Sequence, residues 1–162
     1  MTTRNQQIVI LQVQDQPGVL SRVASLCRRR RFNIKSLTVG TTHKTGISQI
    51  TMVFWKEEAR IKNIVNQLNS LIEVLEAEVV HPKDVIDKEL VLLIAKKDQL
   101  EEYIFKKCTV NDINVRIINE IDGNPVYELL GQGGAIEKLL QGIDIQKNVI
   151  KLVRSGLIAL KL

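Results

Sequence analysis

The chain has 162 residues, of which 44% are hydrophobic and 25% charged, and it carries a formal net charge of +5. This composition is typical of one globular domain or two small ones and excludes a disordered chain. No apolar run approaches the ~20 residues of a membrane-spanning helix, and the first residues lack the apolar segment of a secretory signal. We therefore expect a cytoplasmic protein that has no membrane partner.

The first half of the sequence alternates between strand and helix periodicity. Strands show apolar residues at every second position, and helices show them at the 3.6-residue spacing of an amphipathic stripe. The predicted order is strand 7–14, helix 18–30, strands 33–40 and 48–55, helix 57–70 and strand 74–80. This βαββαβ order predicts a ferredoxin-like domain over residues 1–80, in which both helices cover one face of an antiparallel sheet.

The second half repeats the pattern without close sequence similarity to the first. Residues 81–88 contain a proline and mixed charges without periodicity, so they are predicted to be a linker. The elements expected after it are strand 89–96, helix 99–110, strands 113–121 and 125–130, helix 135–142 and strand 149–153, with 157–160 behind it. The predicted fold class is therefore α+β, with two ferredoxin-like βαββαβ domains in tandem, the second over 89–162.

The turn after the first strand is the strongest candidate for a binding site. The apolar run Ile8–Val13 stops at Asp15-Gln16-Pro17-Gly18, and helical spacing resumes at once. Such a turn exposes the unpaired amide groups and the positive end of the new helix, which favour a small carboxylate. Asn33, at the start of the next strand, adds an amide that can donate and accept.

Other motifs favour structural interpretations. The run Arg28–Arg31 closes the first helix, where cations complement the negative end, and no aromatic residue stands among the arginines to stack on bases. A solvated helix end or a protein-partner patch is therefore favoured over nucleic-acid binding. The glycines of 131–134 lack the Lys-Ser/Thr of a phosphate-binding loop, so a turn is expected there.

No set of residues predicts catalysis or metal binding. His43 and His81 have no Cys or His at ligand spacing, and neither completes a nucleophilic triad. Cys27 and Cys108 fall on the apolar stripes of helices, so both are expected to be buried thiols in a reducing compartment. We predict a non-catalytic chain without a cofactor.

The segment from Asp15 to Gly40, DQPGVLSRVASLCRRRRFNIKSLTVG, resembles the N-terminal part of an ACT domain, in particular that of acetolactate synthase regulatory (small) subunits. The resemblance continues, in the same order, through 46–51, 67–68, 71–74, 88–90 and 153–160. It departs at Arg31, where the family commonly has the glycine that caps the helix, and at Gln49, where it has arginine.

The resemblance implies a function that the residues alone do not establish. It implies a regulatory subunit that activates the thiamine-diphosphate-dependent catalytic (large) subunit and confers feedback inhibition by valine or a related branched-chain amino acid. ACT domains pair along a sheet edge, which implies a homodimer here. The implied effector site comprises Asp15, Gln16, Pro17, Gly18, Val19, Leu20, Asn33 and Ile34. A stand-alone ACT-type amino-acid sensor or transcriptional regulator is the alternative.

Overall fold

The computed structural model describes residues 6–55, 58–96 and 100–162. The chain divides into two compact units. One contains the residues up to Ile86 together with Leu157–Leu162, and the other contains Asp87–Gly156.

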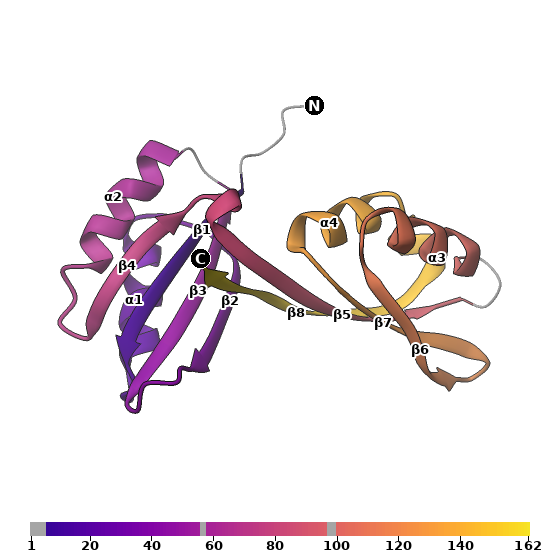
Figure 1. Cartoon of the computed structure of the whole chain (residues 1–162), viewed down its shortest axis with the longest axis horizontal. Coiled ribbons are helices and arrows are strands. Elements are labelled where there is room, and N and C mark those ends of the chain that lie inside the picture. The colour runs from indigo at the N-terminus through magenta and orange to yellow at the C-terminus, as the bar shows by residue number, and fades with distance from the viewer. Residues whose placement is uncertain (1–5, 56–57, 97–99) are drawn as a thin grey trace. The chain divides into compact units, whose positions relative to one another are not determined.

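The first unit has the predicted βαββαβ order. Its elements are β1 (Gln6–Gln14), α1 (Val19–Arg29), β2 (Ile34–Thr41), β3 (Ile47–Trp55), α2 (Glu58–Leu68) and β4 (Val74–Val80). The strands form one sheet in the order β2-β3-β1-β4, and every pairing is antiparallel. Both helices lie on the same face of this sheet (Figure 1). The predicted ferredoxin-like fold is confirmed, and β2 and β4 are the sheet edges.

The core of this unit lies between the sheet and the two helices. Alternate residues of β1 point into it, because successive side chains of a strand face opposite sides. These side chains meet the apolar stripes of α1 and α2, and Val9, Leu11, Val23, Ile61, Ile64 and Leu68 are completely buried. The apolar side chains of the strand and those of the two helices therefore pack together in one layer.

The opposite face of this sheet is partly covered by the C-terminal residues. The hydroxyl of Ser36 accepts from the Leu157 amide at 3.1 Å, and the hydroxyl of Thr38 donates to the Leu157 carbonyl at 2.6 Å. Further along, the Gln49 amide donates to the Ala159 carbonyl at 2.8 Å. A second apolar cluster forms underneath, made of Ile8, Ile10, Val53, Val80, Val85, Leu157 and Ala159.

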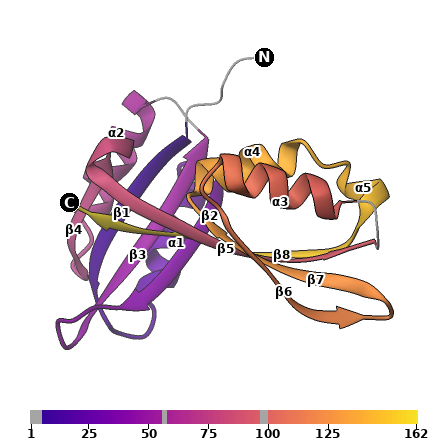
Figure 2. The ribbon, with the colours of Figure 1, turned by 45° about the vertical axis from the view of Figure 1, so that its right-hand side comes forward.

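The second unit repeats the architecture. Its elements are β5 (Val85–Ala95), α3 (Glu101–Val110), β6 (Asn114–Ile121), β7 (Asn124–Gly131), α4 (Gly133–Gln141), α5 (Ile145–Asn148) and β8 (Val149–Lys161). The sheet order is β6-β7-β5-β8, the same as in the first unit, and α3 and α4 share one face of the sheet (Figure 2). Asp122 and Gly123 have φ of +51° and +76°, as a two-residue hairpin turn between β6 and β7 requires.

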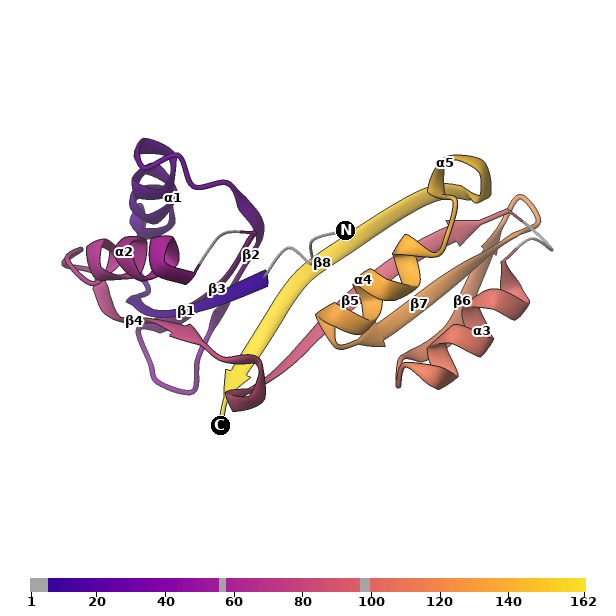
Figure 3. The ribbon, with the colours of Figure 1, turned by 90° about the horizontal axis from the view of Figure 1, so that it is seen from above.

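The boundaries differ from the expected ones in two places. β5 begins at Val85, inside the stretch 81–88 expected to be a linker, where only Pro82–Asp84 forms a 3-10 turn. The last strand is continuous from Val149 to Lys161 instead of ending at Val153 (Figure 3). Ser155-Gly156 interrupts the apolar pattern, but Gly156 takes φ +81° within the strand and lets it continue. Leu157–Leu162 consequently belongs to the first unit and not to a domain 89–162.

A partly buried ion cluster joins the two ends of the second unit's sequence. Arg154 on β8 donates to both carboxylate oxygens of Glu89 on β5 at 2.7 and 2.8 Å, and to Glu137 on α4 at 2.9 Å. Glu89 is only 4% exposed, so Arg154 compensates a carboxylate that is largely shielded from water. The Glu89 and Glu137 carboxylates raise the pKa of Arg154 further above its usual range.

Candidate functional site

The turn between β1 and α1 takes the conformation that its glycine permits. Gly18 precedes the first residue of α1 and has φ +92° and ψ −15°, in the left-handed region where side chains other than glycine are strained. A Cβ added at Gly18 would meet no atom within 4 Å. The glycine is therefore required by its backbone angles, and the space around it is open.

The first turn of α1 presents unpaired amide groups. The Val19 amide donates to the Gln16 carbonyl at 3.4 Å, and the Arg22 amide donates to the Gly18 carbonyl at 3.0 Å. No side chain of the described residues caps this helix end. Within the part of the chain that the structure describes, the amides of Leu20 and Ser21 have no acceptor. Together with the positive end of the helix, they form a place suited to a carboxylate.

Two neighbouring segments hold this turn in place. The Asp15 amide donates to the Gly46 carbonyl and the Gln14 amide to the Glu73 carbonyl, both at 2.9 Å. The Glu73 carboxylate also forms an ion pair with Arg22 on α1. The sequence interpretation did not include Gly46, Glu73 or Arg22 in the site. The one feature of the sequence that could have indicated these three residues is that they lie in segments that carry the family resemblance.

The structure separates the predicted site residues into those that face solvent and one that does not. Asp15, Gln16, Pro17 and Gly18 are exposed. The Leu20 side chain is 43% exposed, so it remains available to an apolar ligand group. The Val19 side chain, in contrast, is only 5% exposed and belongs to the core. Its expected contact with the effector's side chain is therefore not available, although it fixes the start of the helix.

Asn33 and Ile34 lie at the other end of the domain. β1 and β2 each pair antiparallel with β3, so they run parallel to each other. The turn follows the end of β1, whereas Asn33 and Ile34 stand at the start of β2. Asn33 is exposed and Ile34 is half-buried. One copy of the chain therefore does not bring the two halves of the predicted site together.

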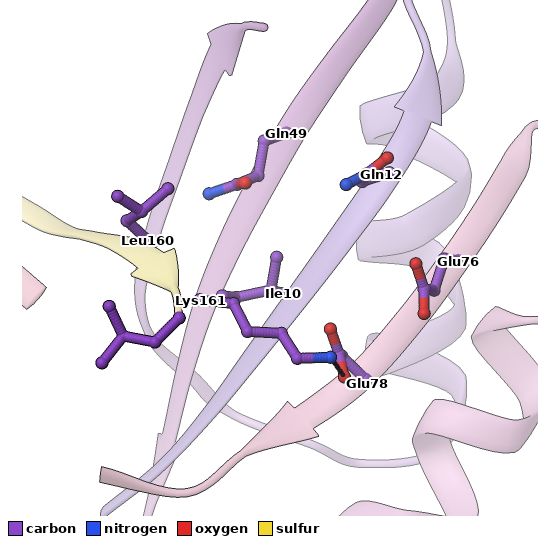
Figure 4. A pocket seen from close by; sticks show the side chains of 8 residues that line it. Ile10, Gln12, Gln49, Glu76, Glu78, Leu160 and Lys161 are labelled. Atoms are coloured by element: carbon purple, nitrogen blue, oxygen red, sulfur yellow. Dashed lines mark hydrogen bonds and ion pairs between the residues drawn. The ribbon is translucent and has the colours of Figure 1, made fainter. Parts of the chain in front are cut away.

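A shallow hollow of about 270 Å³ lies elsewhere, on the sheet face opposite the helices (Figure 4). Its floor includes Gln12 and Gln49, and its acidic wall is formed by Glu76 and Glu78. Lys161 reaches across and donates to Glu78 at 2.6 Å. An amino-acid carboxylate would meet two acids and one cation that is already paired, so this hollow suits the expected effector less well than the helix end.

The remaining candidate motifs have structural roles. The Gly133 amide, at the start of α4, donates to the Asp87 carboxylate at 2.8 Å. This amide of the glycine-rich stretch is therefore bound by an acidic side chain of the same chain. Cys27 and Cys108 are free and buried, as predicted. Burial raises the pKa of both thiols, that of Cys108 to about 11, which disfavours the reactive thiolate.

Residues 6–55, 58–96 and 100–162 contain neither a metal-binding cluster nor a membrane-spanning helix. No group of three or more His, Cys, Asp or Glu side chains lies there in an arrangement that could hold a metal ion. Among the same residues, no helix has the length and apolar character needed to cross a bilayer.

Comparison with known proteins decides the family. The "AHAS small subunit-like ACT domain" family model matches residues 9–76. An acetolactate synthase small subunit from Mycobacterium bovis is 32% identical over 151 residues, which cover 91% of this chain and 87% of the relative. The chain belongs to the acetolactate synthase small subunit family. A probable small subunit from Archaeoglobus fulgidus is 33% identical over 150 residues, 91% of each chain.

A solved structure of the same family extends the likeness to the whole fold. The acetolactate synthase small subunit from Thermotoga maritima is 26% identical, and the superposition covers 98% of both chains with a TM-score of 0.79. The tandem ferredoxin-like architecture and the ACT identity of the first domain are thereby confirmed. The relatives are small subunits, which confirms the interpretation of the chain as a non-catalytic subunit of the regulatory type.

Proposed function

We propose that this chain activates the catalytic large subunit of an acetolactate synthase, in the cytoplasm, and confers feedback inhibition by valine or a related branched-chain amino acid. The observation that carries the proposal is the start of α1, where the amides of Leu20 and Ser21 have no acceptor among the described residues. An amino-acid effector supplies the carboxylate that this helix end favours.

The complete site needs a second copy of the chain. β2 is an edge strand, and its unpaired backbone groups favour pairing with another strand. Two copies joined there by a two-fold axis would pair their β2 strands antiparallel in one eight-stranded sheet. The start of the second copy's β2 would then approach the end at which the first copy's turn lies.

This pairing completes the effector site with both predicted halves. The Leu20 and Ser21 amides would bind the carboxylate, and Asp15 with Asn33 of the second copy would orient the ammonium group. The half-exposed side chains of Leu20 and of Ile34 from the second copy would contact a branched aliphatic side chain. Two equivalent sites would form on each dimer.

Calorimetric titration of the full chain with valine, leucine and isoleucine tests the site, and light scattering of the same samples tests the dimer. The proposal predicts a dimer or larger assembly and one effector molecule bound per chain. A monomer at micromolar concentration, with and without amino acid, would contradict the shared site.

A further inference from the structure

Arg31 occupies a backbone position that favours glycine. It has φ +57°, one of three positive values among the non-glycine residues that the structure describes. The Phe32 amide donates to the Cys27 carbonyl at 2.9 Å, and the Arg31 amide donates to the Arg28 carbonyl at 3.0 Å. These two bonds define a Schellman end of α1 with Arg31 in the left-handed position. Arginine is strained there and glycine is not.

The negative end of α1 favours cations, but Arg28 and Arg29 already supply them in its last turn, so the helix does not require a further arginine at the strained position. The Arg31 side chain is exposed, and no side-chain hydrogen bond or ion pair joins it to the described residues. The preceding Arg30, in contrast, donates to Gln67 on α2 at 2.6 Å. A strained residue whose side chain makes no hydrogen bond or ion pair with the described residues is a candidate for a functional role.

In the dimer proposed above, Arg31 would lie at the end of β2 that approaches the shared site. Arg31 precedes Asn33 by two residues, at the same end of β2. When two β2 edges pair antiparallel, Arg31 of the second copy comes with Asn33 toward the first copy's α1 N-terminus. This step rests on the dimer and the effector site proposed above.

We propose that Arg31 is a specificity-determining residue of the effector site, where its guanidinium binds the effector carboxylate from the side opposite the Leu20 and Ser21 amides. A guanidinium presents parallel N–H donors that match the two oxygens of a carboxylate. The ligand class is therefore a free α-amino acid, and an amino-acid amide or ester, which lacks the carboxylate charge, is discriminated against.

The test measures that discrimination in the full chain. Calorimetry with L-valine and with L-valinamide gives a preference ratio for the parent, for Arg31→Gly and for the control Arg28→Gln. Arg28 is also exposed and its substitution removes the same charge from the same helix end. A charged hydrogen bond at a partly solvated site corresponds to about tenfold in affinity. The ratio should fall about tenfold in Arg31→Gly and remain at the parent value in Arg28→Gln.

A second readout separates binding from folding. Because glycine relieves the left-handed strain, the melting temperature of ligand-free Arg31→Gly should rise. An unchanged valine-to-valinamide ratio in Arg31→Gly would overturn the inference, and the proposed function would stand if Gly18→Asp still weakened valine binding. An equal fall in Arg28→Gln would also overturn it, because the effect would then be one of overall charge. A parent that binds no valine, leucine or isoleucine would overturn both proposals.

Discussion

The pair of substitutions Gly18→Asp and Gly18→Asn tests where the effector carboxylate lies. Both residues must adopt the φ of +92° at this position, and both tolerate the left-handed region better than most side chains, so each incurs a strain of about 1 kcal/mol. No atom of the described residues lies within 4 Å of the added Cβ, so the first carbon of either side chain meets no neighbour. The two variants differ by one negative charge, because aspartate and asparagine have nearly the same shape.

The size of the effect follows from Coulomb's law. Two like charges about 4 Å apart repel by about 4 kcal/mol at an effective dielectric of 20. Solvent at this exposed turn reduces that value, and half of it, about 2 kcal/mol, corresponds to about 30-fold in affinity. We therefore expect Gly18→Asp to bind valine about 30-fold more weakly than Gly18→Asn, as measured by calorimetry at neutral pH.

Thermal melts of the ligand-free variants provide the control. Each variant should melt several degrees below the parent, because about 1 kcal/mol corresponds to roughly 4–8 °C in a domain of this size. The two melting temperatures should be similar to each other. Equal valine affinities of folded Gly18→Asp and Gly18→Asn would refute the reasoning, since no negative ligand group could then lie at this helix end.

Three further predictions concern other parts of the chain. Asn33→Ala should weaken valine binding by about 0.5–1.5 kcal/mol, the value of one hydrogen bond, without changing the melting temperature of the ligand-free protein. Arg154→Met should lower the free energy of unfolding by about 3–5 kcal/mol in urea titrations, because it leaves the Glu89 carboxylate buried without its cation; an effect below 1 kcal/mol would show that water reaches Glu89. Between pH 9 and about 11 the free energy of unfolding of the parent should fall relative to that of Cys108→Ala. The reason is that the Cys108 thiol ionises near pH 9 in the unfolded chain, whereas its pKa in the folded chain is about 11. If the free energies of unfolding of the two proteins change with pH in the same way, the burial effect is contradicted.

Local sequence pattern was sufficient to predict the order of the strands and main helices in both domains, although not the bounds of β5 and β8. Alternation in β1 and helical spacing in α2 specified which side chains enter the core, and the order βαββαβ then specified the sheet topology. In α1 the same spacing indicated Leu20 and Ala24, which are exposed, while Val19 and Leu26 are buried instead. The hairpin turn at Asp122-Gly123 could also be predicted from its own two residues, because a turn with two positive φ angles favours Asp and Gly at these positions. Each of these features depends on neighbours that are close in sequence or on a repeat of the same pattern.

Features that depend on distant contacts could not be predicted in this way. Leu157 is a strand residue of the first unit because Ser36 and Thr38 bind its backbone, and nothing near Leu157 in sequence indicates them. Val19 was included in the effector site because of its position in the turn, but its side chain is packed in the hydrophobic core. Arg31 was recognised as a departure from the family, but its left-handed conformation came from the structure.

The most direct test of the regulatory role is the rate of acetolactate formation by the purified catalytic subunit, measured with and without this chain and across a valine titration. We expect no product from this chain alone and faster turnover when the two are mixed. The added rate should be lost as the valine concentration is raised, and Gly18→Asp should require more valine. Equal rates with and without the chain would contradict the activating role, and a stimulated rate that no branched-chain amino acid lowers would contradict the feedback role.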